Sequence, residues 1–206
     1  MKSTLQPALS LPVMEHFYTI QGEGFYQGKA AYFVRLAGCD VGCPWCDVKE
    51  SWETDKHPVM TIEEIAAAVE ASGNRICVVT GGEPLMHNLD ELTRVIRSRQ
   101  IRTHIETSGA YPLTGQWDWI CVSPKRFKLP LKEMLAVANE LKVVVAHRND
   151  LRWAEQNAKD VNNNCHLFLQ PEWDEAEEIL PLMIDYVKNN QQWEISLQIH
   201  KYLNVP

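Results

Sequence analysis

The segment Ala31-Tyr-Phe-Val-Arg-Leu-Ala-Gly-Cys39-Asp-Val-Gly-Cys43-Pro-Trp-Cys46-Asp47 joins an apolar run with the pattern of a β-strand to a short loop that carries three cysteines. The cysteines have the spacing C-x3-C-x2-C. Iron–sulfur clusters are held by cysteine thiolates, and three thiolates satisfy three irons of a four-iron cluster. The fourth iron keeps an open position, which is where metal chemistry takes place. The loop therefore predicts a [4Fe–4S] site at Cys39, Cys43 and Cys46.

A structural zinc site is the alternative interpretation of this loop, because zinc also binds thiolates and usually takes four ligands. The nearest further ligand candidate is His57, which precedes Pro58 in a polar linker and belongs to no ligand pair. We expect it to be an ordinary loop histidine. The other cysteines, Cys77, Cys121 and Cys165, lie in or beside apolar runs, so we expect them to be buried in the core.

The composition is that of an ordinary globular domain. The chain has 206 residues, of which 45% are hydrophobic and 23% charged, and its formal net charge is -7. We expect one domain over residues 1–206, with no signal peptide and no membrane span, in the cytoplasm, where thiols stay reduced. The negative charge argues against binding to nucleic acid. A small-molecule ligand, with no membrane partner, is the expectation.

Short β-branched runs alternate with helical segments along the chain, a pattern that favours right-handed crossovers and a parallel sheet. The strands are predicted at residues 31–36, 76–80, 103–106, 119–122, 141–145, 166–169 and 194–198. One helix should follow Thr61, which forms a capping-box pattern with Glu64, and another should follow Asn88. A third should be capped by Asp174 and kinked or interrupted at Pro181.

The apolar runs share a second feature, which is that each passes into polar residues at its C-terminal end. In a (β/α) barrel these ends converge on one face, where the active site is built. We therefore expect a partial (β/α) barrel of about six parallel strands with few helices, with the cluster loop and active site at that face. A dinucleotide fold is excluded, because the glycine-rich segment Gln21-Gly-Glu-Gly24 enters a strand and not a helix.

The cysteine spacing resembles that of the radical S-adenosylmethionine superfamily, in which the open iron binds the amino acid end of the cofactor. The turn Thr80-Gly-Gly-Glu-Pro84 is similar to the superfamily motif that holds the cofactor's amino group, since glycines allow close backbone approach and Glu83 supplies a carboxylate. The resemblance implies a cofactor pocket lined by Trp45, Asp47, Gly82, Glu83, Glu106, Ser123, Pro124, Lys125 and Gln170. For Glu106 the alternative to a place in this pocket is a strand-end carboxylate in a hydrogen-bonded turn.

Three further segments closely resemble the 7-carboxy-7-deazaguanine synthase family. They are Phe17-Tyr-Thr-Ile-Gln-Gly-Glu-Gly24, Arg35-Leu-Ala-Gly-Cys39 and Gln198-Ile-His-Lys-Tyr-Leu-Asn-Val-Pro206. The resemblance implies a lyase that converts 6-carboxy-5,6,7,8-tetrahydropterin to 7-carboxy-7-deazaguanine with loss of ammonia, in queuosine biosynthesis. It also implies S-adenosylmethionine as cofactor, flavodoxin or ferredoxin as electron donor, and a homodimer.

The same resemblance implies a substrate site made by Ile20, Gln21, Gly22, Arg35, Thr80, His200 and Pro206. It assigns no catalytic side chain beyond the cofactor-derived radical. Arg35 lies in an apolar strand and needs an anion, which would be the substrate carboxylate or, structurally, Glu15 or Glu23. The C-terminal segment is too apolar for a solvated tail, so we expect it to dock. Family members end at a proline whose carboxylate reaches the substrate, and this chain ends at Pro206.

One position departs from the family pattern. After Cys46 and Asp47 the family usually carries a threonine that ligates Mg²⁺, whereas this chain carries Val48, which cannot coordinate a cation. The use of Mg²⁺ is therefore in question. Two other functions stay open at this point: a different radical enzyme such as a glycyl-radical activase, which has no use for the flanking motifs, and a zinc-binding module, which would share only the thiols.

Overall fold

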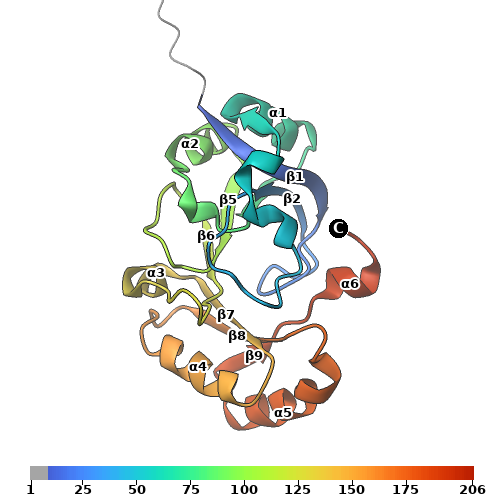
Figure 1. Cartoon of the computed structure of the whole chain (residues 1–206), viewed down its shortest axis with the longest axis vertical. Helices are drawn as coiled ribbons and strands as arrows, with labels where there is room; N and C mark the ends of the chain where they lie inside the picture. The colour runs from blue at the N-terminus through green and yellow to red at the C-terminus, as the bar shows by residue number, and fades with distance from the viewer. Residues whose placement is uncertain (1–8) are drawn as a thin grey trace, which may run out of the picture.

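The computed structural model describes residues 9–206, in which one sheet has the strand order β3-β1-β2-β4-β5-β6-β7-β8-β9 (Figure 1). Strands β2 and β4 to β9 run parallel, while β1 and β3 are antiparallel to their neighbours. Residues 1–7, on which the expectation of no signal peptide rests, lie outside the described residues. The strands are β1 (Ser10–Ile20), β2 (Ala30–Leu36), β3 (Val59–Thr61), β4 (Ile76–Gly81), β5 (Arg102–Thr107), β6 (Trp119–Val122), β7 (Glu140–Val145), β8 (His166–Pro171) and β9 (Trp193–Ile195).

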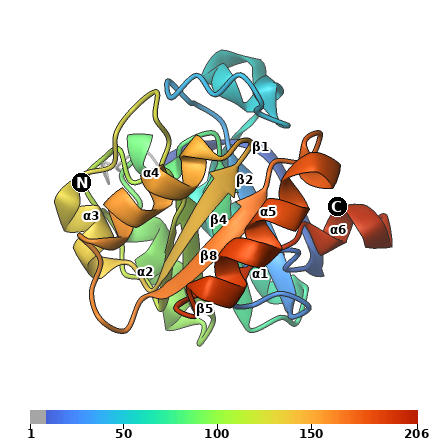
Figure 2. The same ribbon diagram turned by 90° about the horizontal axis from the view of Figure 1, so that it is seen from below.

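Helices lie outside the curve of this sheet, and α4 and α5 cover β7, β8 and β9 on that side (Figure 2). The main apolar core fills the space between helices and sheet. Within residues 9–206, no helix is long and apolar enough to cross a bilayer. The helices are α1 (Ile62–Ala71), α2 (Asp90–Ser98), α3 (Lys132–Val137), α4 (Asn149–Ala158), α5 (Ala176–Asn189) and α6 (Ile199–Leu203), with 3-10 turns η1 (Lys49–Trp52), η2 (Thr54–Lys56) and η3 (Pro84–Met86).

The expected partial barrel is confirmed. The sheet does not close, and its parallel part is somewhat larger than the expected six strands because β9 extends it beyond β8. All predicted strands are present, but the last covers Trp193–Ile195 instead of reaching residue 198. Strands β1 and β3 and helices α3, α4 and α6 were not predicted. Pro12 and scattered charged residues interrupt the apolar pattern of β1, which is why periodicity misses it.

The capping box of α1 is confirmed by contacts in both directions. The Thr61 hydroxyl accepts from the Glu64 N–H at 3.2 Å, and the Glu64 carboxylate accepts from the Thr61 N–H at 2.8 Å. These contacts satisfy two of the N–H groups that a helix start leaves without partners. The local sequence is therefore sufficient to place this helix.

The prediction for α5 was wrong at its N-cap, and the helix is not interrupted at Pro181. Its N-cap is Glu175 and not Asp174, because the Glu172 carboxylate accepts from the N–H groups of both residues and forms the turn instead. Pro181 lies inside the helix, which nevertheless continues to Asn189. Loss of one backbone hydrogen bond is tolerated here because α5 packs on β8 and β9.

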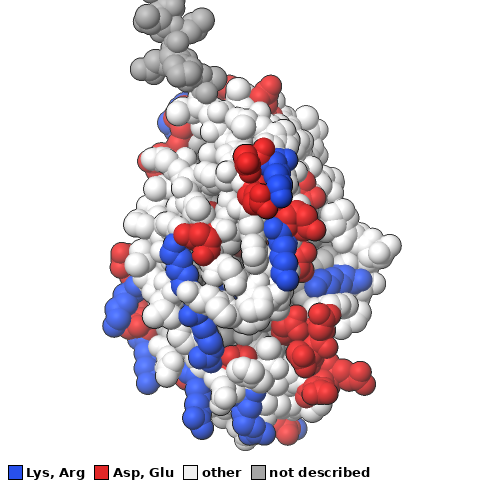
Figure 3. Space-filling view, in the orientation of Figure 1, with Lys and Arg blue, Asp and Glu red and all other residues white. Residues whose placement is uncertain are grey.

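Charged side chains of both signs are interspersed on the face shown in Figure 3, as far as the described residues go. Cys77 and Cys121 are buried as expected, but Cys165 is only half-buried because it lies in the turn before β8. Cys77 pairs with Tyr32 in the first half of β2, whereas the cysteine loop follows the C-terminal end of that strand. The residues left to form a site are therefore those at the strand ends.

Candidate active site

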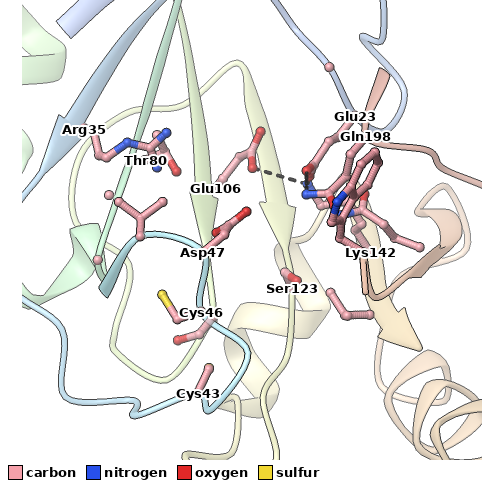
Figure 4. A pocket seen from close by; sticks show the side chains of 18 of the residues that line it. Glu23, Arg35, Cys43, Cys46, Asp47, Thr80, Glu106, Ser123, Lys142 and Gln198 are labelled. Carbon is pink, nitrogen blue, oxygen red and sulfur yellow. Dashed lines mark hydrogen bonds and ion pairs between the residues drawn. The ribbon is translucent and has the colours of Figure 1, made fainter. Parts of the chain in front are cut away.

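A cavity of about 300 Å³ opens at the C-terminal ends of the parallel strands. It receives side chains from β2, β4, β5, β7 and β8, from the cysteine loop, and from both the β1–β2 connection and the C-terminal segment (Figure 4). Nearly all predicted site residues line it. They are Ile20, Gln21, Gly22, Arg35, Cys39, Cys43, Trp45, Cys46, Asp47, Thr80, Gly82, Glu83, Glu106, Ser123, Lys125, Gln170, His200 and Pro206.

Pro124 is the one predicted site residue that does not line the cavity. It is buried, whereas its neighbours Ser123 and Lys125 both reach the cavity. Lys125 bends back, and its ammonium donates to the Ser123 carbonyl at 2.9 Å and to its hydroxyl at 2.6 Å. The proline thus contributes no surface to the cavity.

The cysteine loop is held by backbone hydrogen bonds to η1. The Gly38 N–H donates to Ser51 O at 2.6 Å, and the Cys39 N–H donates to Trp52 O at 3.3 Å. Burial is the main cause that raises the pKa of the Cys39 and Cys43 thiols. In residues 9–206, no three His, Cys, Asp or Glu side chains gather closely enough for a single metal ion. All three loop cysteines line the cavity. This arrangement suits an iron–sulfur cluster, in which each of the three thiolates binds a different iron.

The Gly-Gly-Glu turn packs directly on the cysteine loop. A Cβ atom on Gly82 would lie 2.3 Å from Gly38 O, and the Glu83 N–H donates to the same oxygen at 2.8 Å. Gly81 has a φ of 147° and touches the Leu36 backbone, so neither position has room for a side chain. The glycines therefore join the two predicted motifs through backbone contact.

The Glu83 carboxylate is almost fully buried and has several donors. It accepts from the Thr107 hydroxyl at 2.6 Å, from the Ser108 N–H at 2.8 Å and hydroxyl, and from the Leu85 N–H at 3.0 Å. These neutral donors hold the carboxylate at the cavity wall. The site thus has a carboxyl group fixed in place beside the cysteine loop, with no cationic partner among the described residues.

Three other residues predicted for the cofactor side have protein partners of their own. Gln170 accepts from the Ser196 hydroxyl at 3.0 Å, and the Trp45 ring packs edge-on against Phe127. Asp47 lies 3.6 Å from the ammonium of Lys201 in α6. The cysteine loop and the C-terminal helix are therefore linked across the mouth of the cavity.

Arg35 has one of the two structural partners considered from the sequence. Its Nε donates to the Glu15 carboxylate at 2.7 Å across the β1–β2 pair, while Glu23 lies elsewhere in the site. No other hydrogen bond of the guanidinium occurs among the described residues, and the side chain lines the cavity. The outer edge of the planar fork is thus available to a second anion.

The C-terminal segment docks as expected. The Ile199 N–H donates to Gly22 O at 3.0 Å, and a Cβ on Gly22 would lie 2.0 Å from Nδ1 of His200. Burial is the main cause that lowers the pKa of His200. Tyr202 and Leu203 are exposed, so the docking depends on the first residues of α6 and on Pro206, which reaches the cavity.

Three residues that the sequence did not assign to the site also line the cavity, near the C-terminal segment: Glu23, Lys142 and Gln198. Glu106 accepts from Gln21 Nε2 at 2.7 Å and from the Lys142 ammonium at 3.3 Å, and Lys142 also contacts Glu23. Gln198 donates to Glu23 at 2.8 Å. Lys142 and Val144 share one face of β7, so a lysine within a predicted strand was the available signal.

This fold and site define a radical S-adenosylmethionine protein, and the family model described as the radical SAM superfamily matches residues 33–142. The sequence is 53% identical to 7-carboxy-7-deazaguanine synthase of Flavobacterium psychrophilum, over 95% of this chain and 93% of that protein. It is 47% identical to the synthase of Synechocystis sp., over 96% and 94%. The crystal structure of QueE from Escherichia coli superposes with a TM-score of 0.83 at 31% identity, over 92% and 94%. The chain belongs to the 7-carboxy-7-deazaguanine synthase family.

Proposed function

We propose that this protein converts 6-carboxy-5,6,7,8-tetrahydropterin to 7-carboxy-7-deazaguanine with loss of ammonia, as a radical S-adenosylmethionine lyase of queuosine biosynthesis. The observation that carries the proposal is the meeting of three distant segments in one cavity: the cysteine loop, the Gln21-Gly-Glu-Gly24 segment and the C-terminal residues from Gln198. A glycyl-radical activase would need only the first of them. The family relationship favours the same reaction.

On the cofactor side, Cys39, Cys43 and Cys46 would hold a [4Fe–4S] cluster. When bound, the cluster and S-adenosylmethionine supply the radical that abstracts hydrogen from C6 of the pterin. Glu83 would accept hydrogen bonds from the cofactor's ammonium group, since its carboxylate is held at the cavity wall by neutral donors. Trp45, Asp47, Gly82, Glu106, Ser123, Lys125 and Gln170 would form the remaining walls.

On the substrate side, Arg35 would bind the pterin carboxylate through the guanidinium edge that Glu15 leaves open. Ile20, Gln21 and Gly22 would contact the ring, with Thr80, His200 and Pro206 as further contacts. These residues would bind the pterin and orient its C6 atom toward the cysteine loop. No side chain of the chain is assigned a proton-transfer role.

Several features of the cellular setting belong to this proposal. The chain would act as a single domain over residues 1–206, as a homodimer, and in the cytoplasm, where its six free cysteines stay reduced. Flavodoxin or ferredoxin would supply the electron. The residues near Asp47 do not favour a protein-anchored Mg²⁺, because Val48 lines the cavity with a hydrocarbon side chain and Asp47 already faces Lys201. An ion held by substrate oxygens and water would fit better.

The direct test is turnover by anaerobically reconstituted protein, with iron, sulfide and zinc measured on the same sample. We expect about four irons and four sulfides per chain, and formation of 7-carboxy-7-deazaguanine together with 5′-deoxyadenosine. Cofactor cleavage without conversion of the pterin, but with activation of a glycyl-radical enzyme, would support the activase instead. Zinc in place of iron after reconstitution would support the zinc module.

A further inference from the structure

The ammonium group of Lys142 lies at the floor of the cavity, away from water. The side chain is 5% exposed, and its two ionic partners, Glu23 and Glu106, come from the β1–β2 connection and from β5. Burial alone would lower the pKa of Lys142, but the facing carboxylates raise it well above its ordinary value. A buried cation of this kind is retained only where its partners compensate the loss of hydration.

Lys142 closes a ring of polar contacts. Gln21 Nε2 donates to Glu106 Oε1 at 2.7 Å, Glu106 Oε2 accepts from Lys142 at 3.3 Å, and Lys142 donates to Glu23 Oε2. The Glu23 N–H then donates back to Gln21 Oε1 at 3.1 Å. Gln198 adds the C-terminal segment, through a 2.8 Å hydrogen bond to Glu23 Oε1. One lysine therefore connects three separate parts of the cavity wall.

The charges explain why the lysine is needed. The ring holds two carboxylates and one ammonium, and the ammonium is the group that holds the carboxylates near each other. Its attraction is the main cause that lowers the pKa of Glu23 to about 2 against the effect of burial. Without it, two like charges would face each other in a poorly hydrated site, and the Gln21 to Glu23 segment would have to move.

We propose that Lys142 is a positioning residue for the pterin, which fixes Gln21 and Glu23 in place and couples them to the C-terminal segment. The inference rests on the proposed function and deepens it. Figure 4 shows Arg35 and Lys142 on opposite sides of the cavity, with Glu106 between them. Arg35 would hold the carboxylate end of the substrate, and the ring of polar contacts organised by Lys142 would position the pterin ring system. The contacts of Lys142 include none with the cysteine loop.

The test compares Lys142→Met with the same change at Lys132, which is 83% exposed and pairs only with Asp160. We expect Lys142→Met to raise the KM for 6-carboxytetrahydropterin about tenfold or more, because the segment from Gln21 to Glu23, which orients the pterin ring, is no longer held in place. Its rate of 5′-deoxyadenosine formation without pterin should change far less than the KM, since Glu106 is the one residue of the cofactor pocket that Lys142 contacts among the described residues. Lys132→Met should match wild type in both measurements.

A charge-matched variant, Lys142→Met with Glu106→Gln, separates positioning from stability. Its ring carries one net negative charge, as in the wild type, so its thermal stability should exceed that of Lys142→Met. Its KM should remain high, because Glu23 has lost its ammonium partner and with it the link to β5. If Lys142→Met does not fold, this variant carries the comparison.

Two results would overturn the inference. The first is a folded Lys142→Met, or the double variant, with the KM of the wild type. The second is an equal loss of pterin turnover and of pterin-free cofactor cleavage, which would indicate a general structural defect. Failure of the wild type itself to convert the pterin would overturn the proposed function instead, so the two failures are distinguishable.

Discussion

The two sides of the cavity are built in different ways. On the cofactor side, residues 38–47 and 80–84 meet through backbone contacts such as that of the Glu83 N–H with Gly38 O. On the substrate side, side chains meet that lie far apart in the sequence, and Glu23 and Gln198 are separated by 175 positions. Backbone contacts survive most side-chain changes, whereas a side-chain network depends on every member. The substrate side should therefore be the more sensitive to single substitutions away from the motifs.

The strongest test of this comparison removes the cofactor side alone. Cys43→Ala should abolish cluster assembly and cofactor cleavage, since one of three ligands is lost. Pterin binding, measured by calorimetry, should change little, because the substrate side has its own contacts. Cys77→Ala is the matched control, a buried cysteine in β4 whose loss should cost only about 1 kcal/mol of stability. A Cys43→Ala protein that retains four irons and cleaves cofactor would contradict the ligand assignment.

The converse test removes the charge contact on the substrate side. Arg35→Ala should raise the KM for the pterin about 100-fold or more, and Arg35→Lys should restore little, because an ammonium does not reproduce a planar fork. Glu15→Gln is the control, since it removes the ion pair that Arg35 makes within the protein. An effect of Glu15→Gln as large as that of Arg35→Ala would make the arginine a structural residue.

Acid should lower the stability of the folded protein through His104, a buried residue of β5. This side chain is 3% exposed, its Nε2 has no hydrogen-bond partner in the described residues, and burial lowers its pKa from 6.5 to about 4. The unfolded chain binds the proton first, so stability should fall from pH 6.5 and cease to fall near pH 4, by roughly 3 kcal/mol in all.

The variant His104→Phe removes the titrating group but keeps a ring beside Tyr26 and Trp119. Its free energy of unfolding, measured by denaturant titration, should depend less on pH between 6.5 and 4 than that of the wild type. The same slope in both proteins would assign the acid sensitivity to other groups.

The smallest expected effect lies at the boundary between the two sides. Val48→Thr should lower the Mg²⁺ concentration needed for half-maximal turnover a few-fold, because it adds a protein oxygen near Asp47. Chelator-treated wild type and variant would be compared over the same concentration series, with Val48→Ala as the control for side-chain size. A wild type as responsive to Mg²⁺ as the threonine variant would indicate that another group supplies the oxygen.

The accuracy of the sequence predictions follows the same division. The strands of the parallel sheet, the capping box at Thr61 and the cysteine loop depend on spacings of a few residues, and the structure has them where they were expected. The differences concern choices between adjacent residues. The N-cap of α5 is Glu175 and not Asp174, and Pro124 is buried and does not line the cavity that Ser123 and Lys125 line. Periodicity contains no information on either choice.

The amino-acid sequence by itself determined the family, the order of the parallel strands, and which loops carry the cavity residues, because these depend on residue types at short, fixed spacings. The tertiary structure decided how the charged groups pair. It placed Arg35 beside Glu15, Asp47 opposite Lys201, and Lys142 between two carboxylates. Such pairs form between segments that lie apart in the sequence, so they follow from the register and curvature of the sheet, which no local pattern encodes.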